Sequence, residues 1–289
     1  MKASKLKKII KHNDYYREQI ARECYMFYKN IGRQTPTVIP DIQTVAEIIF
    51  ADKGYKLLHI PMESKEIGAF QLKLNGFNYL VLNTAKNMAY NNFSVAHELY
   101  HILIQEECTN RWDIYKDEYS DDEHEMMANA FAGNVMMPEE DFVLTYENIR
   151  KNLVNLKNAE RTEYFDKYFI ITMLMNYFRT TYMSVVVRCF ETGRFDIKDE
   201  ALVENLLVNN NKKALSNICE KYALYVKMNS IMEISYLDDF KQLLVEAEAE
   251  GKEKIKQGLL SQEDLEYKLD GMRRAYMEVV KAECQHGKQ

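Results

Sequence analysis

The sequence predicts an α+β fold that is mostly helical. Residues 55–60 form one candidate strand, and Phe70, Leu72 and Leu74 alternate with polar residues in a second. Asn75-Gly76 favours a two-residue β-hairpin turn into a returning strand over residues 77–82, so a small antiparallel sheet is expected there. Most of the remaining chain, including everything after Pro138, repeats apolar residues at steps of three and four, the spacing of a buried helix face. Only 4 prolines and 10 glycines occur in 289 residues, which indicates few irregular loops.

Two helices are expected before this sheet. Four apolar residues at steps of four, four and three form one stripe of an opening helix that ends near Gly32: Tyr16, Ile20, Cys24 and Phe27. After a connector with two prolines, Asp41 is the expected N-cap of a second helix and Gly54 its carboxy-terminal cap. The chain should then turn into the sheet.

Two more helices are expected after the sheet. Asn91 and Asn92 can cap the first of them, and a polar, acidic segment, residues 106–122, separates it from the second. Asp122 is the expected N-cap of the second helix, because Glu125 follows it at the capping-box spacing.

The end of the chain carries two long apolar stripes. They are expected to pack as an antiparallel helix pair around residues 251–258, and core packing is favoured over a coiled coil with a partner. Their members are Leu237, Phe240, Leu244 and Ala247 in one stripe and Leu265, Leu269, Met272, Tyr276 and Val279 in the other.

Composition excludes several classes of protein. The longest apolar stretch, residues 169–178, is about half of the roughly 20 residues that a membrane span requires. The net charge of -6 argues against direct nucleic-acid binding, although the first eleven residues include five lysines. The five cysteines are scattered and show no Cys-x-x-Cys spacing, so reduced thiols are expected. Because residues 1–10 lack the apolar core of a signal peptide, a cytoplasmic protein is expected.

Residues 97–101, His-Glu-Leu-Tyr-His, have the residue types and the spacing of a metal site. Two histidines four residues apart on a helix project from one face, so both imidazoles can bind one ion, for which zinc is the natural candidate. Glu98 lies about 100° round the helix from His97, where it can accept a proton from a metal-bound water. The spacing therefore predicts two metal ligands, His97 and His101, and a general base, Glu98. Without a metal, the two histidines would simply be bonded within the protein.

A catalytic zinc usually takes a third protein ligand and keeps its fourth position for water. Glu125 is the chosen candidate, because it lies in the first turn of the next helix and the intervening loop is long enough to bring that helix back. Glu123 and His124 are the alternatives, and they face other directions.

Two segments resemble the ImmA/IrrE family of metallopeptidases. Residues 93–103 read Phe-Ser-Val-Ala-His-Glu-Leu-Tyr-His-Ile-Leu, and residues 125–138 read Glu-Met-Met-Ala-Asn-Ala-Phe-Ala-Gly-Asn-Val-Met-Met-Pro. That family pairs a His-Glu-x-x-His helix with a Glu-x-x-Ala-Asn-x-Phe-Ala helix that ends in Met-Pro. The combination is much more specific than either motif. A further segment, Phe178 to Arg188, resembles a weakened form of the family's Phe-x-Val-Ser region, with Thr181 as the N-cap of a helix.

The resemblance implies a zinc metallo-endopeptidase with a zincin-like core, in which the small sheet and an active-site helix are followed by a helical C-terminal region. It implies zinc ligation by His97, His101 and Glu125, with Glu98 as the catalytic base, while Asn129 is placed to orient a ligand. Tyr100 departs from the family, which usually has Gly there, so helix packing or substrate access is expected to differ.

The expected domains are an N-terminal helix over residues 1–35, a zinc metallopeptidase core over 36–150, a helix-turn-helix-like segment over 151–200 and a helical C-terminal region over 201–289. Family members typically cut one protein, often a helix-turn-helix transcriptional repressor of a mobile element or stress response. The resemblance therefore implies a repressor as the protein substrate. The alternative is a non-catalytic, zinc-containing regulatory or binding protein that acts through its helical C-terminal half.

Overall fold

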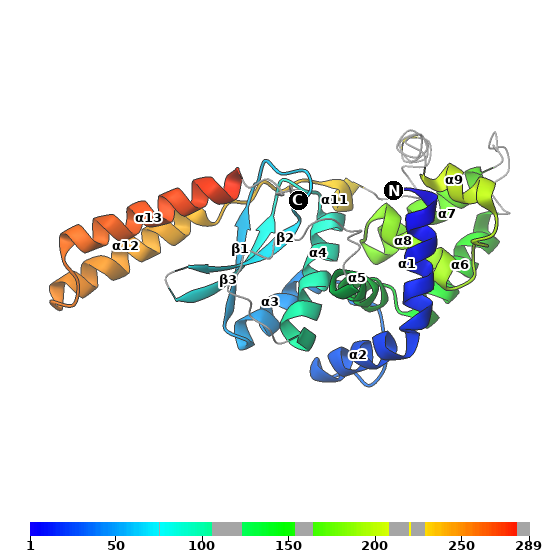
Figure 1. The fold of residues 1–289 in the computed structure, drawn as a ribbon, viewed down its shortest axis with the longest axis horizontal. Helices are drawn as coiled ribbons and strands as arrows, with labels where there is room; N and C mark the ends of the chain where they lie inside the picture. Colours follow the sequence, from blue (N-terminus) through cyan, green and yellow to red (C-terminus); the bar gives the residue numbers. More distant parts are fainter. Residues whose placement is uncertain (75, 106–122, 154–163, 208–219, 221–228, 282–289) are drawn as a thin grey trace.

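The computed structural model describes residues 1–74, 76–105, 123–153, 164–207, 220 and 229–281. Within these ranges the chain is mostly helical and has one small sheet, which confirms the predicted α+β class (Figure 1). The elements, in chain order, are α1 (Ala3–Tyr15), α2 (Arg17–Asn30), α3 (Ile42–Asp52), β1 (Tyr55–Ile60), β2 (Ala69–Leu74), β3 (Phe77–Asn83), α4 (Met88–Tyr100), the π-helical turn η1 (His101–Gln105), α5 (Glu123–Met136), α6 (Glu139–Leu153), α7 (Phe165–Phe178), α8 (Tyr182–Glu191), α9 (Glu200–Leu207), α11 (Asn229–Met232), α12 (Phe240–Lys256) and α13 (Gln262–Val280).

The sheet is mixed, so the prediction of an antiparallel sheet was wrong for one of its two strand pairs. Its order is β1-β3-β2. Strands β2 and β3 form the expected antiparallel hairpin, with Gly76 at a φ of +86° in the turn, whereas β1 runs parallel to β3. The hairpin is encoded locally by its turn. The edge and direction that β1 adopts depend on contacts between distant segments, which the alternation of side chains does not specify.

Helices cover both faces of the sheet. Helices α3 and α4 pack on one face, where Tyr55, Leu80 and Leu82 join the main hydrophobic core. The second face carries its own apolar cluster, which includes Phe70 and is closed by Val279 at the end of α13. Helix α4, which carries His97 and continues into η1 with His101, therefore rests directly on the sheet (Figure 1).

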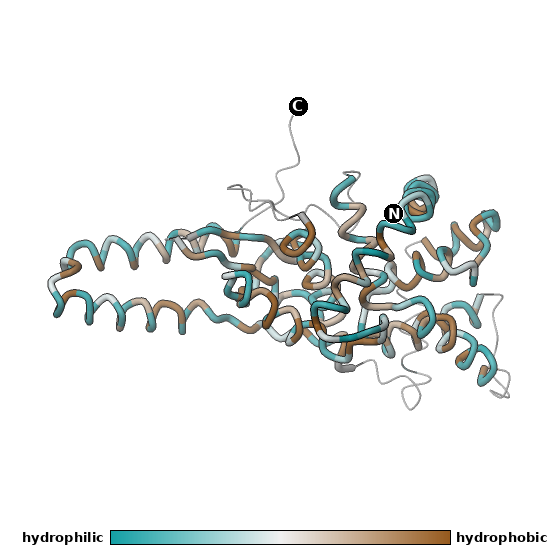
Figure 2. Tube along the Cα trace, turned by 90° about the horizontal axis from the view of Figure 1, so that it is seen from below, coloured by the Kyte–Doolittle hydropathy of each residue, from teal (hydrophilic) through white to brown (hydrophobic). Residues whose placement is uncertain are grey.

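Helices α12 and α13 form the expected antiparallel pair. The pair projects from the sheet as a long arm, joined at its far end by residues 257–261 (Figures 1 and 2). Much of the arm surface is hydrophilic, and the apolar residues between the helices include Leu265, Leu269 and Met272. Contacts between the two helices bury most of the predicted stripes, but Leu237, which the sequence placed in the first stripe, precedes α12 and is 49% exposed.

The N-terminal segment contains two helices, whereas the sequence pattern predicts one. Helix α1 ends at Tyr15, and α2 continues in a new direction from Arg17. Both helices pack on α5: the Tyr28 hydroxyl donates a hydrogen bond to the Val135 carbonyl at 2.7 Å, and the Phe27 ring lies edge-on to Phe131.

Helix caps test several local predictions. Asp41 accepts a hydrogen bond from the Thr44 amide and Thr181 accepts one from the Ser184 amide, so both N-caps are confirmed. The cap of α4 is Asn87, one turn before the predicted Asn91 and Asn92, which are buried within the helix. Asp122 and the acidic loop lie outside the described residues. No helix in the described part of the chain is long and apolar enough to cross a membrane.

Candidate metal centre

His97, His101 and Glu125 converge from two helices. Their potential ligand atoms all lie within 4.8 Å of one another. His97 Nε2 is 2.9 Å from His101 Nε2 and 3.3 Å from Glu125 Oε2, and His101 Nε2 is 3.6 Å from Glu125 Oε1. The two histidines occupy adjacent turns of α4 and η1, and Glu125 lies in the first turn of α5, which packs against α4. The structure thus brings together the three residues that were predicted as ligands.

Asn129 orients one of the two imidazoles. Its Oδ1 lies 3.1 Å from His97 Nδ1, a contact that in the neutral imidazole favours the proton on Nδ1 and leaves the lone pair on Nε2, the nitrogen that faces Glu125. Asn129 follows Glu125 by one turn of α5, which gives both residues the same side of that helix. The side chain of His97 is 1% exposed, so this orientation is fixed by packing as well.

The three residues fit a metal ion with tetrahedral coordination. Bonds of about 2.0–2.1 Å to zinc place neighbouring ligand atoms about 3.3 Å apart, close to the three separations above. Glu125 Oε2 is buried and has no hydrogen-bond partner among the described residues. When His97 is neutral with its proton on Nδ1, its Nε2 lone pair faces a carboxylate oxygen at 3.3 Å, an arrangement that a metal cation or a proton on Nε2 relieves. Two imidazoles and one carboxylate are ligands that suit zinc.

The charges of the cluster favour an ionised Glu125. Burial disfavours its charged form, but protonated His97, whose Nε2 can donate a hydrogen bond to this carboxylate, and the charges of His97 and His101 outweigh burial and lower the pKa of Glu125. Burial likewise opposes protonation of His97, yet Glu125 raises the pKa of His97 above its usual value. The two shifts describe one pair, in which an anionic carboxylate holds a positive charge in place.

Glu98 lies beside this group, in a dry environment. It is 4% exposed, and burial raises the pKa of its carboxyl above the ordinary value. Gln71 Nε2, on strand β2, lies 3.4 Å from Glu98 Oε2. A buried carboxylate with a raised pKa next to a potential metal site has the properties of a general base.

The segment that contains this site is similar to a known protein family. Residues 50–190 match the model of the IrrE N-terminal-like domain, the peptidase M78 family. The chain contains an IrrE-like domain. No curated protein and no solved structure matches the chain. The match spans both motif helices, and the family supports a metallopeptidase type of function.

The alternatives to Glu125 in the IrrE-like domain do not join the ligand group. The Glu123 carboxylate accepts a hydrogen bond from the Tyr16 hydroxyl, which holds it toward α2. His124 is not part of the converging group. Of the remaining histidines, His59 bonds Asp239 at 2.7 Å and His12 lies 3.0 Å from Asn13 Oδ1, while His286 is outside the described residues.

Tyr100 packs in the core of the IrrE-like domain, and its ring also lies edge-on to the ring of His101, with 5.8 Å between the centroids. Its side chain is buried and its ring lies 5.6 Å from the ring of Phe131 on α5. Helix α4 therefore gains, at the position where the family usually has Gly, an aromatic contact with the helix that carries Glu125.

Two side chains that sequence reasoning gave no role hold the far end of α5. Pro138 follows this helix and has no amide hydrogen to donate, so the last carbonyls need other partners. The Tyr28 hydroxyl donates a hydrogen bond to the Val135 carbonyl, and Arg188 Nε donates one to the Met137 carbonyl at 3.0 Å. Sequence alone marked Arg188 only as part of a motif.

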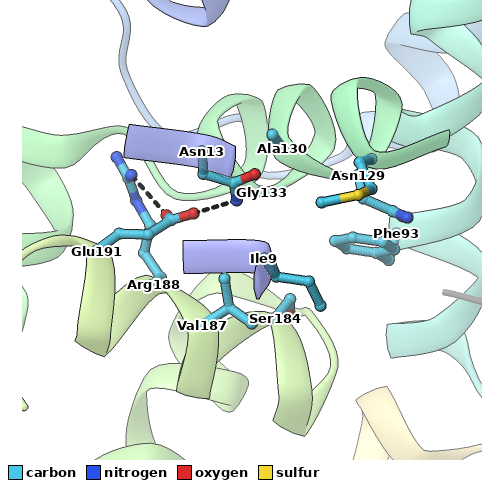
Figure 3. Close-up of a pocket in the computed structure, with 11 residues that line it drawn as sticks. Ile9, Asn13, Phe93, Asn129, Ala130, Gly133, Ser184, Val187, Arg188 and Glu191 are labelled. Atoms are coloured by element: carbon cyan, nitrogen blue, oxygen red, sulfur yellow. Dashed lines mark hydrogen bonds and ion pairs between the residues drawn. The ribbon is translucent and has the colours of Figure 1, made fainter. Parts of the chain in front are cut away.

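Arg188 is itself anchored by a buried polar network. Figure 3 shows its guanidinium bonded to Glu191, whose other oxygen accepts a hydrogen bond from Asn13 on α1. The arginine is 4% exposed and places a positive charge at the carboxy-terminal end of α5, where the helix dipole is negative. The N-terminal helices and α8 therefore support the helix that presents Glu125.

Proposed function

We propose that this chain is a zinc-dependent endopeptidase. The observation that carries the proposal is the convergence of His97, His101 and Glu125 beside the buried carboxylate of Glu98. The match to a peptidase family over residues 50–190 supports it. Two ligands on one helix, a third on a neighbouring helix and a base next to the first ligand are what metal-assisted hydrolysis of an amide requires.

The protein's own residues have separate tasks in this reaction. His97, His101 and Glu125 would hold the zinc, and Asn129 would keep the first imidazole in the tautomer that binds it. Bound zinc supplies Lewis acidity, which polarises the peptide carbonyl and acidifies a water. Glu98 would take the proton from that water at its carboxylate and deliver it to the leaving amine. Its burial makes the carboxylate more basic than an exposed one, which suits both transfers.

We place the substrate among proteins, and the resemblance to the ImmA/IrrE family favours a helix-turn-helix transcriptional repressor of a mobile element or stress response in the cytoplasm. Cleavage of one particular protein requires a docking surface for that substrate in addition to the metal centre. The arm of α12 and α13 is our candidate, because it projects from the sheet and exposes apolar side chains at Val245, Leu259 and Tyr267. Replacing Leu259 and Tyr267 by serine should raise KM for the repressor and leave kcat unchanged; an unchanged KM contradicts docking on the arm.

Incubation with a repressor encoded beside this chain tests the proposed reaction. The purified protein should cleave it, and a chelator or the substitution Glu98→Gln should stop cleavage while Glu98→Gln keeps one zinc per chain. Glu123→Gln is the matched control, because that carboxylate bonds Tyr16 outside the ligand group, and it should retain cleavage. If Glu98→Gln still inactivates the repressor without cleaving it, the chain acts as a non-catalytic, zinc-containing binding protein, and the endopeptidase proposal is wrong.

A further inference from the structure

We propose that Gln71 is a positioning residue for Glu98 and that the hydroxyl of Tyr55 holds Gln71 in place. The inference rests on the proposed function for the role of Glu98 as the base, and it rests on the side-chain contacts in the structure for the rest. Tyr55 Oη lies 3.0 Å from Gln71 Oε1, and Gln71 Nε2 lies 3.4 Å from Glu98 Oε2. The three side chains form a relay from strand β1 through strand β2 to helix α4.

The sheet brings this relay together. Strand β3 lies between β1 and β2, and Tyr55 and Gln71 project from the face of the sheet on which α4 packs. Residues that alternate with them, such as Phe70 and Leu72, lie in the apolar cluster on the opposite face. The register of β2 therefore decides that Gln71 faces the buried carboxylate, and a slip by one residue would remove the amide from the site.

The contacts of Gln71 fix which end of its amide faces Glu98. The amide oxygen accepts a hydrogen bond from the Tyr55 hydroxyl, so the NH₂ group is the end that is turned to the carboxylate. The opposite orientation would place the amide oxygen against an anion. Tyr55 is 9% exposed and Glu98 is 4% exposed, so water has little access to replace either contact.

The relay has a consequence for proton transfer. A carboxylate that rotates freely presents either oxygen in many directions, whereas a base must hold one oxygen within hydrogen-bond reach of the proton. A hydrogen bond from Gln71 to Oε2 leaves Oε1 as the oxygen that accepts the proton. Because both ends of the Gln71 amide are engaged, we assign this side chain to orienting the base and not to binding substrate.

A double-mutant cycle on cleavage of the co-encoded repressor tests the relay. Gln71→Met keeps the length of the side chain and removes the donor, so kcat should fall about 10- to 100-fold at unchanged KM. Tyr55→Phe should lower kcat by a smaller factor, and the double variant should be no slower than Gln71→Met alone, since Tyr55 acts only through Gln71. Tyr79→Phe is the matched control: it removes a hydroxyl from the opposite face of the same sheet and should leave kcat unchanged. The relay is overturned if the losses of kcat in the two single variants multiply in the double variant, or if Gln71→Met raises KM and leaves kcat unchanged.

A spectroscopic measurement separates this inference from the proposed function. In metal-free protein labelled with ¹⁵N-glutamine, the side-chain NH₂ signals of Gln71, identified by their loss in Gln71→Met, should shift in Tyr55→Phe and in Glu98→Gln and stay in place in Tyr79→Phe. The absorption spectrum of the cobalt-loaded protein should be the same for Gln71→Met and wild type, because Gln71 is not a ligand. If the Gln71 signals shift in neither Tyr55→Phe nor Glu98→Gln, the relay is refuted even if the protein is a peptidase. If the signals shift in a protein that has no peptidase activity, the relay is supported and the proposed function is wrong.

Discussion

The side-chain oxygen of Asn129 lies 3.1 Å from Nδ1 of His97, and Asn129 stands one turn after Glu125 on the same helix. Helix α5 therefore carries the third proposed zinc ligand, Glu125, and also the residue that contacts the imidazole of the first proposed ligand, His97. A displacement of α5 would disturb both at once. The metal centre consequently depends on the contacts that hold α5, which include Tyr28 and Arg188.

Replacing Asn129 by leucine should lower zinc affinity about 10- to 100-fold, the usual loss when a partner of a ligating histidine is removed. Asn129→Asp keeps an acceptor for the Nδ1 proton and should bind zinc far better than the leucine variant. Competition with a chromophoric chelator measures both affinities. Equal affinities for wild type and Asn129→Leu would show that the hydrogen bond does not orient His97.

Tyr100 should matter for stability more than for metal binding. Tyr100→Gly removes a buried ring that contacts Phe131 and introduces glycine into α4, so the free energy of unfolding should fall by about 3–5 kcal/mol. Tyr100→Phe keeps the ring and should cost less than about 1.5 kcal/mol. Urea denaturation of the two metal-free variants gives the comparison. A stable Tyr100→Gly protein would mean that the ring is not part of the core.

Alkaline pH should destabilise the protein partly through Tyr146. Burial raises the pKa of Tyr146 to about 12, above its ordinary value of 10.0. Because the folded state has the higher pKa, this tyrosine contributes stability that is fully present below pH 10 and is lost as the pH rises through about 12. Unfolding of Tyr146→Phe, followed between pH 9 and 12, should show a smaller loss of stability than wild type; equal slopes would contradict the burial of this hydroxyl.

Two glycines in the arm should respond to alanine in opposite directions. A Cβ on Gly251 would overlap Leu265 Cδ1 on the facing helix, so Gly251→Ala should destabilise the arm by about 1–3 kcal/mol. A Cβ on Gly271 would meet no atom within 4 Å, and Gly271→Ala should stabilise the helix by about 0.5–1 kcal/mol. Thermal denaturation followed by circular dichroism measures both. The account of arm packing fails if the two variants melt alike.

The features that the sequence predicted correctly are local ones. The hairpin at Gly76, the caps at Asp41 and Thr181 and the paired helices of the arm each depend on residues a few positions apart, so spacing is enough to find them. The histidine spacing likewise predicted that His97 and His101 share one side of a helix. Their meeting with Glu125 was predicted from its place in the first turn of the next helix and from the motif resemblance, and the structure brings the three together.

The features that the sequence did not reveal depend on distant contacts. The parallel pairing of β1 with β3 brings Tyr55 to Gln71, and no periodicity within either strand encodes that pairing. Gln71 gives no motif signal, although its place in an alternating strand could have assigned it to the helix-covered face. Arg188 was noticed as part of a motif, but its hydrogen bond to the Met137 carbonyl joins residues 51 positions apart.

X-ray absorption at the zinc edge of the purified, zinc-loaded protein tests the metal centre most directly. We expect one zinc per chain with nitrogen and oxygen neighbours only, two of them imidazoles at about 2.0–2.1 Å, and a loss of bound zinc in Glu125→Ala. Sulfur neighbours at about 2.3 Å, or full zinc occupancy after Glu125 is removed, would contradict it.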